Sequence, residues 1–313
     1  MTTGITLPPA AVPAIVIGGW LGAGKTTLVN HLLRHAGGQR LAVLVNDFGA
    51  LAIDADLIDG DAAAGEVLAL AGGCICCSFG ADLLSALQQV LRREPRPDRV
   101  LIEASGVGMP AAIARTAKLA QGLQVEGNVV LADASTVRER ARDPYVGDTV
   151  QQQLREADLL LVTQTDRVTP DALAQVQAWL DAEGFVAPRL AVVQGRVAPE
   201  LVLDVQALER EREREINATR WSGADAVTPP PFSHASREFT QPIDLSALVA
   251  MLTAPGAQVL RAKGVLTGLD GRRHLLQGVG RRIELRPIEP GEPAPAIDRL
   301  LLIGLGELTG LLP

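Results

Sequence analysis

The sequence predicts an α/β protein in which a doubly wound, mostly parallel sheet is followed by a smaller α+β unit with an antiparallel sheet. Short and almost wholly apolar runs alternate with amphipathic stretches over residues 10–200, which is typical of parallel strands buried between helices. After about residue 236, short strand-like runs follow one another with glycine-rich turns between them, as in a small antiparallel sheet. The length of 313 residues fits two such units.

Six apolar runs predict the strands of the first unit: Ala14–Ile17, Leu41–Val45, Val100–Ile102, Val129–Leu131, Leu159–Val162 and Leu190–Val193. Amphipathic stretches predict its helices: Thr26–His35, Ala81–Arg93, Met109–Leu119 and Pro170–Glu183. The runs are brief and apolar on both sides, so helices are expected on both faces of the sheet. Residues 10–200 are therefore predicted to form one domain.

The pattern changes after about residue 200. Acidic and basic residues alternate over Glu209–Glu215, which predicts a solvated helix face. The stretches Pro229–Pro231 and Ser233–Ser236 have the composition of a linker. We therefore assign residues 201–235 to a linker with a charged helix.

Residues 236–313 are predicted to form the second unit. Asp244 or Ser246 is expected to cap a helix that runs through Met251. Four strands are predicted after it, at Val259–Thr267, Arg273–Gln277, Arg282–Arg286 and Leu300–Ile303.

Composition excludes several classes of function. A net charge of −7 argues against a protein that binds nucleic-acid backbones, and 3% aromatic residues leave little for base stacking. No apolar run is long and clean enough to span a bilayer. The first residues lack a basic group before their apolar part, so they do not resemble a secretory signal. We expect a cytoplasmic protein that binds neither nucleic acid nor membrane.

The first helix is preceded by a phosphate-binding motif. Residues 18–28 read GGWLGAGKTTL, in which Gly19, Gly24, Lys25 and Thr26 satisfy G-x-x-x-x-G-K-[ST]. Glycines let successive N–H groups point at one phosphate, and the following helix adds its positive end. Lys25 is expected to bind the outer phosphates and Thr26 to offer its hydroxyl to Mg²⁺. The sequence therefore predicts a nucleoside triphosphate on the loop from Gly19 to Thr27, including Ala23.

Carboxylates at the ends of two apolar runs are candidate magnesium ligands. Asp47 follows LAVLVN and Glu103 follows VLI, and the carboxyl ends of parallel strands line the ligand crevice of such sheets. Gly106 is expected to present a backbone N–H to the terminal phosphate. Asp133 is similarly placed but less specific. For each carboxylate the alternative is a cap of a turn or helix.

A further carboxylate concerns the choice of base. The segment Leu159–Asp166 reads LLLVTQTD, and a carboxylate at Asp166 can accept both N–H groups on the Watson–Crick edge of guanine. Adenine places an acceptor there, so Asp166 favours GTP over ATP. Thr163 and Gln164 stand where GTPases usually carry Asn and Lys, which is expected to loosen the preference.

All three cysteines of the chain lie within four positions, in the segment GGCICCS. Cys74, Cys76 and Cys77 supply three soft ligands for an ion such as Zn²⁺, which prefers four. The fourth ligand is open among water, Glu66, Asp47 and a side chain of a partner. Two alternatives to a metal site also remain open: cysteines packed as small apolar residues, and a redox switch.

Four motifs in order resemble the CobW-type family of P-loop metallochaperone GTPases, which includes nitrile hydratase activators and zinc-transfer GTPases. They are GGWLGAGKTTL at 18–28, NDFG at 46–49, GGCICC at 72–77 and EASG at 103–106. LRAKGVL at 260–266 and RLLLIGLG at 299–306 resemble the C-terminal domain of that family. The resemblance implies GTP hydrolysis coupled to delivery of a transition metal, often zinc or cobalt, to a client protein.

The resemblance also implies roles for particular residues. Gly22, Gly24, Lys25, Thr26 and Thr27 would hold phosphate and Mg²⁺, while Glu103 and Gly106 match the second nucleotide motif and Cys74, Cys76 and Cys77 the metal motif. The family usually has NEFGE where this chain has Asp47 and Ala50. We expect Lys25, Glu103 and Asp47 to serve hydrolysis, with Thr26, Asp47 and Glu103 around magnesium.

The resulting hypothesis is a nucleotide-gated metal carrier, and a homodimer is compatible with it. The Asp47 loop is expected to become ordered around the γ-phosphate and to relax on hydrolysis. Two alternatives remain. One is a regulatory binding module that acts by nucleotide-dependent docking, and the other is a small-molecule kinase with incidental or redox-active thiols.

Overall fold

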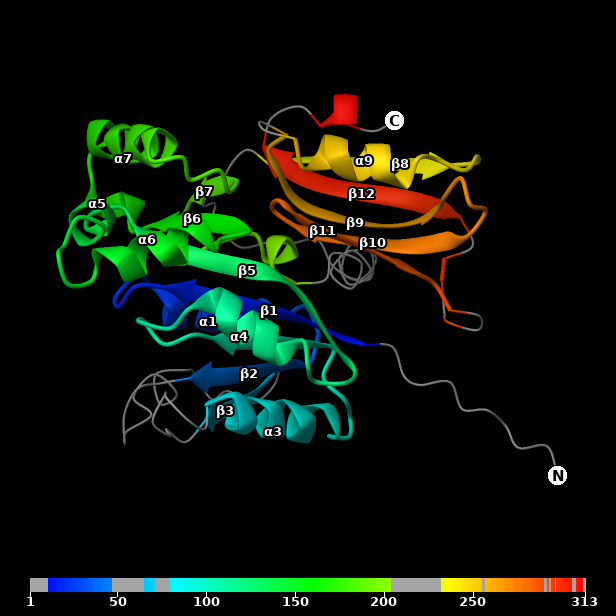
Figure 1. Ribbon diagram of the computed structural model, residues 1–313, viewed down its shortest axis with the longest axis horizontal. Coiled ribbons are helices and arrows are strands. Elements are labelled where there is room, and N and C mark those ends of the chain that lie inside the picture. Colours follow the sequence, from blue (N-terminus) through cyan, green and yellow to red (C-terminus); the bar gives the residue numbers. More distant parts are fainter. Residues whose placement is uncertain are drawn as a thin grey trace, which may run out of the picture.

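Two β-sheets, one parallel and one antiparallel, form the framework of the protein (Figure 1). The computed structural model describes residues 11–46, 65–70, 79–203, 232–254, 257–289, 292, 294–295, 297–305 and 308–311. The first sheet has seven strands in the order β3-β2-β4-β1-β5-β6-β7, and every neighbouring pair is parallel. The second has five strands in the order β11-β10-β9-β12-β8, all antiparallel. The predicted fold class is confirmed.

Six strands of the parallel sheet correspond to the six predicted apolar runs; five contain the whole run, whereas the last ends at Ala191 and contains only part of Leu190–Val193. They are β1 (Val12–Gly19), β2 (Leu41–Asn46), β4 (Arg99–Glu103), β5 (Leu123–Asp133), β6 (Leu159–Thr163) and β7 (Arg189–Ala191). A seventh strand, β3 (Gly65–Leu70), is not among the predicted runs; it lies at the sheet edge, and among the described strands it pairs with β2. Its apolar residues VLAL form a run as long as Ala14–Ile17, so the sequence does carry a signal for this strand.

The four predicted helices are also present, as α1 (Lys25–Arg34), α3 (Phe79–Leu91), α4 (Pro110–Ala117) and α7 (Pro170–Ala182). Two helices were missed: α5 (Val137–Arg140) and α6 (Gly147–Arg155). The first is a single turn. In the second, Val150 and Leu154 are the only large apolar residues, and they are too few to give a clear helical period.

Helices cover both faces of the parallel sheet. One face packs against α1 and against the segment Leu201–Leu203, together with Leu260, Val279 and Ile303 of the second sheet. The opposite face packs against α3 and α4 over one half and against α5, α6 and α7 over the other. The alternating faces of β1 show the arrangement, since Ile15 and Ile17 belong to the first core and Ala14 and Val16 to the second.

The antiparallel sheet consists of β8 (Phe232–Phe239), β9 (Val259–Thr267), β10 (Arg273–Val279), β11 (Arg282–Pro287) and β12 (Asp298–Leu305). The helix α9 (Leu245–Leu252) covers one face of it. Of the two predicted caps, Asp244 is the one used, because its carboxylate accepts from the N–H groups of Ser246 and Ala247 at 2.9 and 3.0 Å. The stretch Ser233–Ser236 belongs to β8, not to a linker, because pairing with β12 satisfies its backbone.

The two sheets contact each other through a turn and a buried ion cluster. Arg281, in the turn between β10 and β11, donates its N–H to the carbonyl oxygen of Asp158 at 3.1 Å. The neighbouring Gly280 lies so close that a Cβ atom would be 1.7 Å from that oxygen. Beside this contact, Glu126 of β5 accepts from Arg99 of β4 at 2.7 Å and from Arg261 of β9 at 2.8 Å. The second unit is thus joined to the first by specific polar contacts.

Several predicted features lie outside the described residues. These are the charged stretch Glu209–Glu215, the Asp47 loop and the cysteine motif. In the part of the chain that the structure does describe, no helix is both long and apolar enough to cross a membrane.

Candidate functional site

The segment between β1 and α1 has the backbone of a phosphate loop. Gly19, Gly22 and Gly24 have φ values of 130°, 78° and 93°. Residues other than glycine rarely adopt these values, because their Cβ atom would clash with the backbone. At Gly19 a Cβ atom would stand 2.4 Å from the carbonyl oxygen of Leu131 in β5, so a larger residue has no room. α1 begins directly after Gly24, so the loop ends at the positive end of the helix dipole.

Lys25 and Thr26, in the first turn of α1, contact the loop and the end of β4. Nζ of Lys25 donates to the carbonyl oxygens of Gly19 at 3.1 Å and Trp20 at 3.4 Å. Oγ1 of Thr26 donates to Oε1 of Glu103 at 3.1 Å, although the two residues are 77 positions apart in the sequence. A hydroxyl and a buried carboxylate so close together are the oxygen ligands that Mg²⁺ prefers. The pair therefore fits a magnesium ion, which would neutralise phosphate charge there.

Thr163 and Gln164 hold the phosphate loop from the other side. Oγ1 of the buried Thr163, the last residue of β6, donates to the carbonyl oxygen of Ala23 at 2.8 Å. Nε2 of Gln164 donates to the carbonyl oxygen of Gly22 at 2.7 Å, and its Oε1 accepts from Arg167 at 2.8 Å. The sequence motif had suggested only a role in base recognition for these two positions. These side chains reach the loop only because β6 packs beside it. No local sequence pattern reveals a contact between residues so far apart in the chain.

Thr163→Val tests this support of the loop. The substitution keeps the shape of the side chain but leaves the buried carbonyl oxygen of Ala23 without its donor, which is expected to cost about 1–2 kcal/mol of stability. GTP and GDP affinity should fall by similar factors, because both ligands carry the phosphates that the loop contacts. Denaturant unfolding and nucleotide titration measure the two effects. Thr136→Val is the control, since the Thr136 side chain makes no capping hydrogen bond; an equal effect there would contradict the assignment.

Asp166 lies in a short 3₁₀ turn, η1 (Thr165–Arg167), directly after β6 and is exposed. The segment that follows β7 approaches the same region, because Thr165 Oγ1 donates to the carbonyl oxygen of Val192 at 3.3 Å. Gly195 in that segment packs so tightly on the start of α1 that a Cβ atom would be 3.0 Å from the backbone nitrogen of Leu28. The carboxylate of Asp166 is thus open to solvent beside the phosphate loop.

The parallel sheet orders the remaining candidates along one edge. In β4, Glu103 pairs with Val45 of β2, and β2 ends at Asn46, one residue before Asp47. The neighbouring β3 ends at Leu70, four residues before Cys74. The strand order β3-β2-β4-β1 places the ends of β3 and β1 three strand spacings apart, about 14 Å. Asp47 and the three cysteines themselves lie outside the described residues.

Asp133, the last residue of β5, stabilises the turn that follows this strand. Its Oδ1 accepts from the N–H of Ser135 at 2.8 Å and from the Ser135 hydroxyl at 2.6 Å, so the carboxylate caps a turn. This is the alternative that was left open for it. Within the described ranges, no three His, Cys, Asp or Glu side chains gather into a group that could hold a metal ion.

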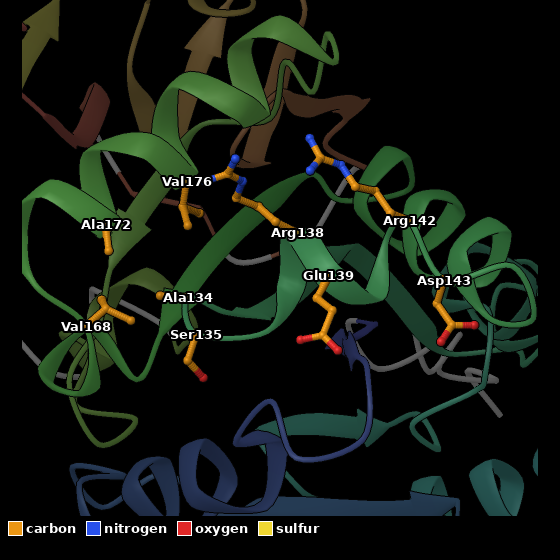
Figure 2. Close-up of a pocket in the computed structure, with 9 residues that line it drawn as sticks. All are labelled: Ala134, Ser135, Arg138, Glu139, Arg142, Asp143, Val168, Ala172 and Val176. Atoms are coloured by element: carbon orange, nitrogen blue, oxygen red, sulfur yellow. The ribbon is translucent and has the colours of Figure 1, made fainter.

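A separate surface hollow of about 640 Å³ lies between α5 and α7 (Figure 2). Arg138 and Arg142 extend to one side of it, and Glu139 and Asp143 to the other. Arg138 donates to Oε1 of Gln175 at 3.2 Å, and Asp143 accepts from the backbone of its own turn. The described lining includes no residue of the phosphate loop, so we do not assign the hollow to the nucleotide.

Comparison with known protein families gives two matches along the chain. Residues 13–185 match the family described as CobW/HypB/UreG, nucleotide-binding domain. Residues 232–308 match the cobalamin synthesis protein CobW C-terminal domain. The first match contains the phosphate loop, Glu103 and Asp166, and the second contains all five strands of the antiparallel sheet.

Three relatives illustrate the similarity. The zinc chaperone YjiA of Escherichia coli is 32% identical, with 87% of each chain covered. The zinc chaperone CobW of a Sinorhizobium species is 28% identical, with 95% of this chain and 94% of the relative covered. The zinc-regulated GTPase metalloprotein activator 1 of Schizosaccharomyces pombe is 25% identical, with 90% and 78% covered. Because the family models match residues 13–185 and 232–308, the chain belongs to the CobW/HypB/UreG family of nucleotide-binding proteins.

Proposed function

We propose that the protein is a GTP-hydrolysing metal carrier that acts in the cytoplasm. GTP binds on the loop from Gly19 to Thr27, with Thr26, Glu103 and Asp47 around Mg²⁺ and Asp166 on the guanine edge. The cargo is a transition metal, zinc in the first place and cobalt as the alternative. Cys74, Cys76 and Cys77 bind it, and a client metalloprotein receives it.

One observation carries the proposal. A phosphate loop with its Thr26–Glu103 pair stands in a chain whose three cysteines are confined to four positions. Relatives over most of the chain are named as zinc chaperones and as a zinc-regulated GTPase, which supports zinc as the cargo. Three thiolates with an open fourth position suit an ion that must later be released.

Strand order supports a coupling between cargo and nucleotide. The cysteine motif follows β3, the Asp47 loop follows β2, and Glu103 ends β4, so three adjacent parallel strands lead to the three elements. In the proposed cycle, the Asp47 loop closes on the γ-phosphate and Mg²⁺ and opens after hydrolysis. A change at β2 then reaches the neighbouring cysteine motif. Reciprocity requires that the metal alters nucleotide affinity by the same factor.

The test is metal binding under nucleotide control. Protein purified without tags or chelators is expected to carry about one zinc per chain, and Cys76→Ser should lose it while GTP still binds. Ser78→Ala, next to the motif, is the control and should keep the metal. Zinc affinity is then measured by competition with a chelator in the presence of GDP or a non-hydrolysable GTP analogue. Equal affinities in the two states would rule out the coupling, and zinc retained by Cys76→Ser would rule out the site.

A further inference from the structure

A buried glutamine of α6 holds the turn that follows Glu103. Gln153 is 1% exposed, and its Nε2 donates to the carbonyl oxygen of Gly106 at 3.0 Å and of Gly108 at 2.9 Å. A side-chain amide nitrogen carries two hydrogens, so one group satisfies both carbonyls at once. The residue could not be predicted from the sequence, because α6 has too few apolar residues to show a helical period.

The turn itself packs against the phosphate loop. Ala104, at its start, donates its N–H to the carbonyl oxygen of Ile17 in β1 at 2.8 Å. A Cβ atom on Gly106 would lie 2.3 Å from Cδ2 and 2.9 Å from the backbone nitrogen of Leu21 in the loop. The turn therefore follows directly after Glu103, which binds Thr26, and contacts the backbone of the phosphate loop at Leu21. A small shift of the turn changes the geometry of the phosphate site.

Two hydrogen bonds fix the orientation of the peptides in this turn. In a trans peptide the C=O and N–H groups point in opposite directions. The carbonyl of Gly106, bound by Gln153, therefore aims the N–H of Val107 away from that side chain. The carbonyl of Ser105 accepts from the N–H of Gly108 at 2.9 Å, which fixes the N–H of Gly106 in the same way.

The same helix also fixes the far end of the turn. Oε2 of Glu156, just beyond the last residue of α6, accepts from the N–H of Ala111 at 2.9 Å in the first turn of α4. The N-terminus of α4 has no capping side chain of its own, so this carboxylate serves it from α6. Gln153 and Glu156 thus hold the connection between β4 and α4 at two points.

We propose that Gln153 is a positioning residue for GTP hydrolysis, which holds the turn from Ser105 to Gly108 so that the N–H groups of Gly106 and Val107 meet the γ-phosphate. The inference rests on the proposed GTPase function. The proposed role distinguishes contacts that GTP and GDP share from contacts that only the γ-phosphate of GTP can make. The phosphate loop and Asp166 serve GTP and GDP alike, whereas the turn acts only on the phosphate that GDP lacks. Loss of the glutamine then impairs hydrolysis and spares GDP binding.

The experiment compares Gln153→Met with Gln88→Met in the full-length chain. Methionine keeps the length of the side chain and its helix propensity but has no donor. Gln88 is an exposed glutamine of α3, on another helix, so its variant controls for the substitution without touching Gln153 or Glu156. We expect Gln153→Met to lower kcat for GTP by about 10- to 100-fold, as for a small misplacement of a catalytic group. Affinity for a non-hydrolysable GTP analogue should weaken several-fold, and the Kd for GDP should stay within about twofold of the wild type.

Each result bears on the inference. An unchanged kcat overturns it, and so does an equal loss of GDP and GTP-analogue affinity together with a lower Tm, because a purely structural role would give that. If Gln153→Met is not folded, Gln153→Asn is measured instead, since it keeps the amide on a shorter stem and should give an intermediate kcat with normal GDP affinity. The wild type separates the two hypotheses: without GTP hydrolysis the proposed function fails, whereas equal hydrolysis by wild type and variant refutes only the role of Gln153.

Discussion

Replacement of Glu126 with alanine is expected to lower the free energy of unfolding by about 3–5 kcal/mol, because it leaves two buried guanidinium groups without a counter-charge. The Glu126 side chain is fully buried, and it binds Arg99 at 2.7 Å and Arg261 at 2.8 Å. Arg261 comes from the antiparallel sheet, so the contact between the two sheets should loosen as well. Denaturant unfolding measures the loss.

An exposed ion pair provides the control for this prediction. Glu238 and Arg299 form a pair on β8 and β12 with side chains that are 49% and 57% exposed. Glu238→Ala should cost no more than about 1 kcal/mol, as is typical of surface pairs. If Glu126→Ala were as mild as this control, water would have to solvate the cluster, and its burial would be refuted.

The same cluster predicts a pH dependence of stability. Burial by itself would raise the pKa of Glu126, but the charges of Arg261 and Arg99 outweigh it and lower the pKa from 4.5 to about 2. A carboxylate with a depressed pKa stabilises the fold above its unfolded-state pKa, and this stabilisation is lost as the pH falls through the folded-state pKa. The wild type should therefore lose about 3 kcal/mol from this residue between about pH 4.5 and pH 2. Glu126→Gln should show a flatter profile there.

Lys25→Ala is expected to have the largest effect on nucleotide chemistry, a loss of about 10²–10³ in kcat/KM for GTP, as for removal of a group that stabilises developing charge. The chain has only three lysines, at 25, 118 and 263, and Lys25 alone lies in the motif. Its ammonium already contacts the carbonyl oxygens of Gly19 and Trp20, so it is held within the loop that is to take the phosphates. Steady-state hydrolysis and nucleotide titration check the prediction.

The matched control for Lys25→Ala is Lys118→Ala. Lys118 lies 3.6 Å from Glu284 in a half-exposed pair outside the loop, and its loss should leave GTP turnover unchanged. The zinc that we propose for the cysteine motif should be retained in both variants, because neither lysine belongs to that motif. Turnover of Lys25→Ala within about threefold of the wild type would mean that the phosphate site lies elsewhere.

Much of the site follows from residues that are close in sequence. The glycines at 19, 22 and 24 and the Lys25–Thr26 pair define the loop, and all three glycines have the positive φ that such a loop requires. Glu103 was expected near magnesium because strand ends share one edge of a parallel sheet, and it does contact Thr26. Asp47 and the cysteines stay predictions, since they lie outside the described residues.

Long-range contacts could not be predicted in this way. Thr163 and Gln164 looked like weakened base-reading residues, yet their side chains hold the carbonyl oxygens of Ala23 and Gly22. A polar side chain does not reveal its partner when that partner is 140 positions away. The burial of Glu126 could not be predicted either. This residue lies where the register between β1 and β5 shifts, and the sequence of β5 alone does not reveal such a shift.

The fold class, the phosphate loop and the concentration of the thiols follow from the sequence, because each depends on the period of apolar residues or on a run of neighbouring residues. The three-dimensional packing shows which polar side chains fix the loop, which glutamine holds the turn after Glu103, and how the two sheets are joined. These contacts form because a buried polar group must find a partner at hydrogen-bonding distance. Packing of distant elements, and no local pattern, decides which partner that is.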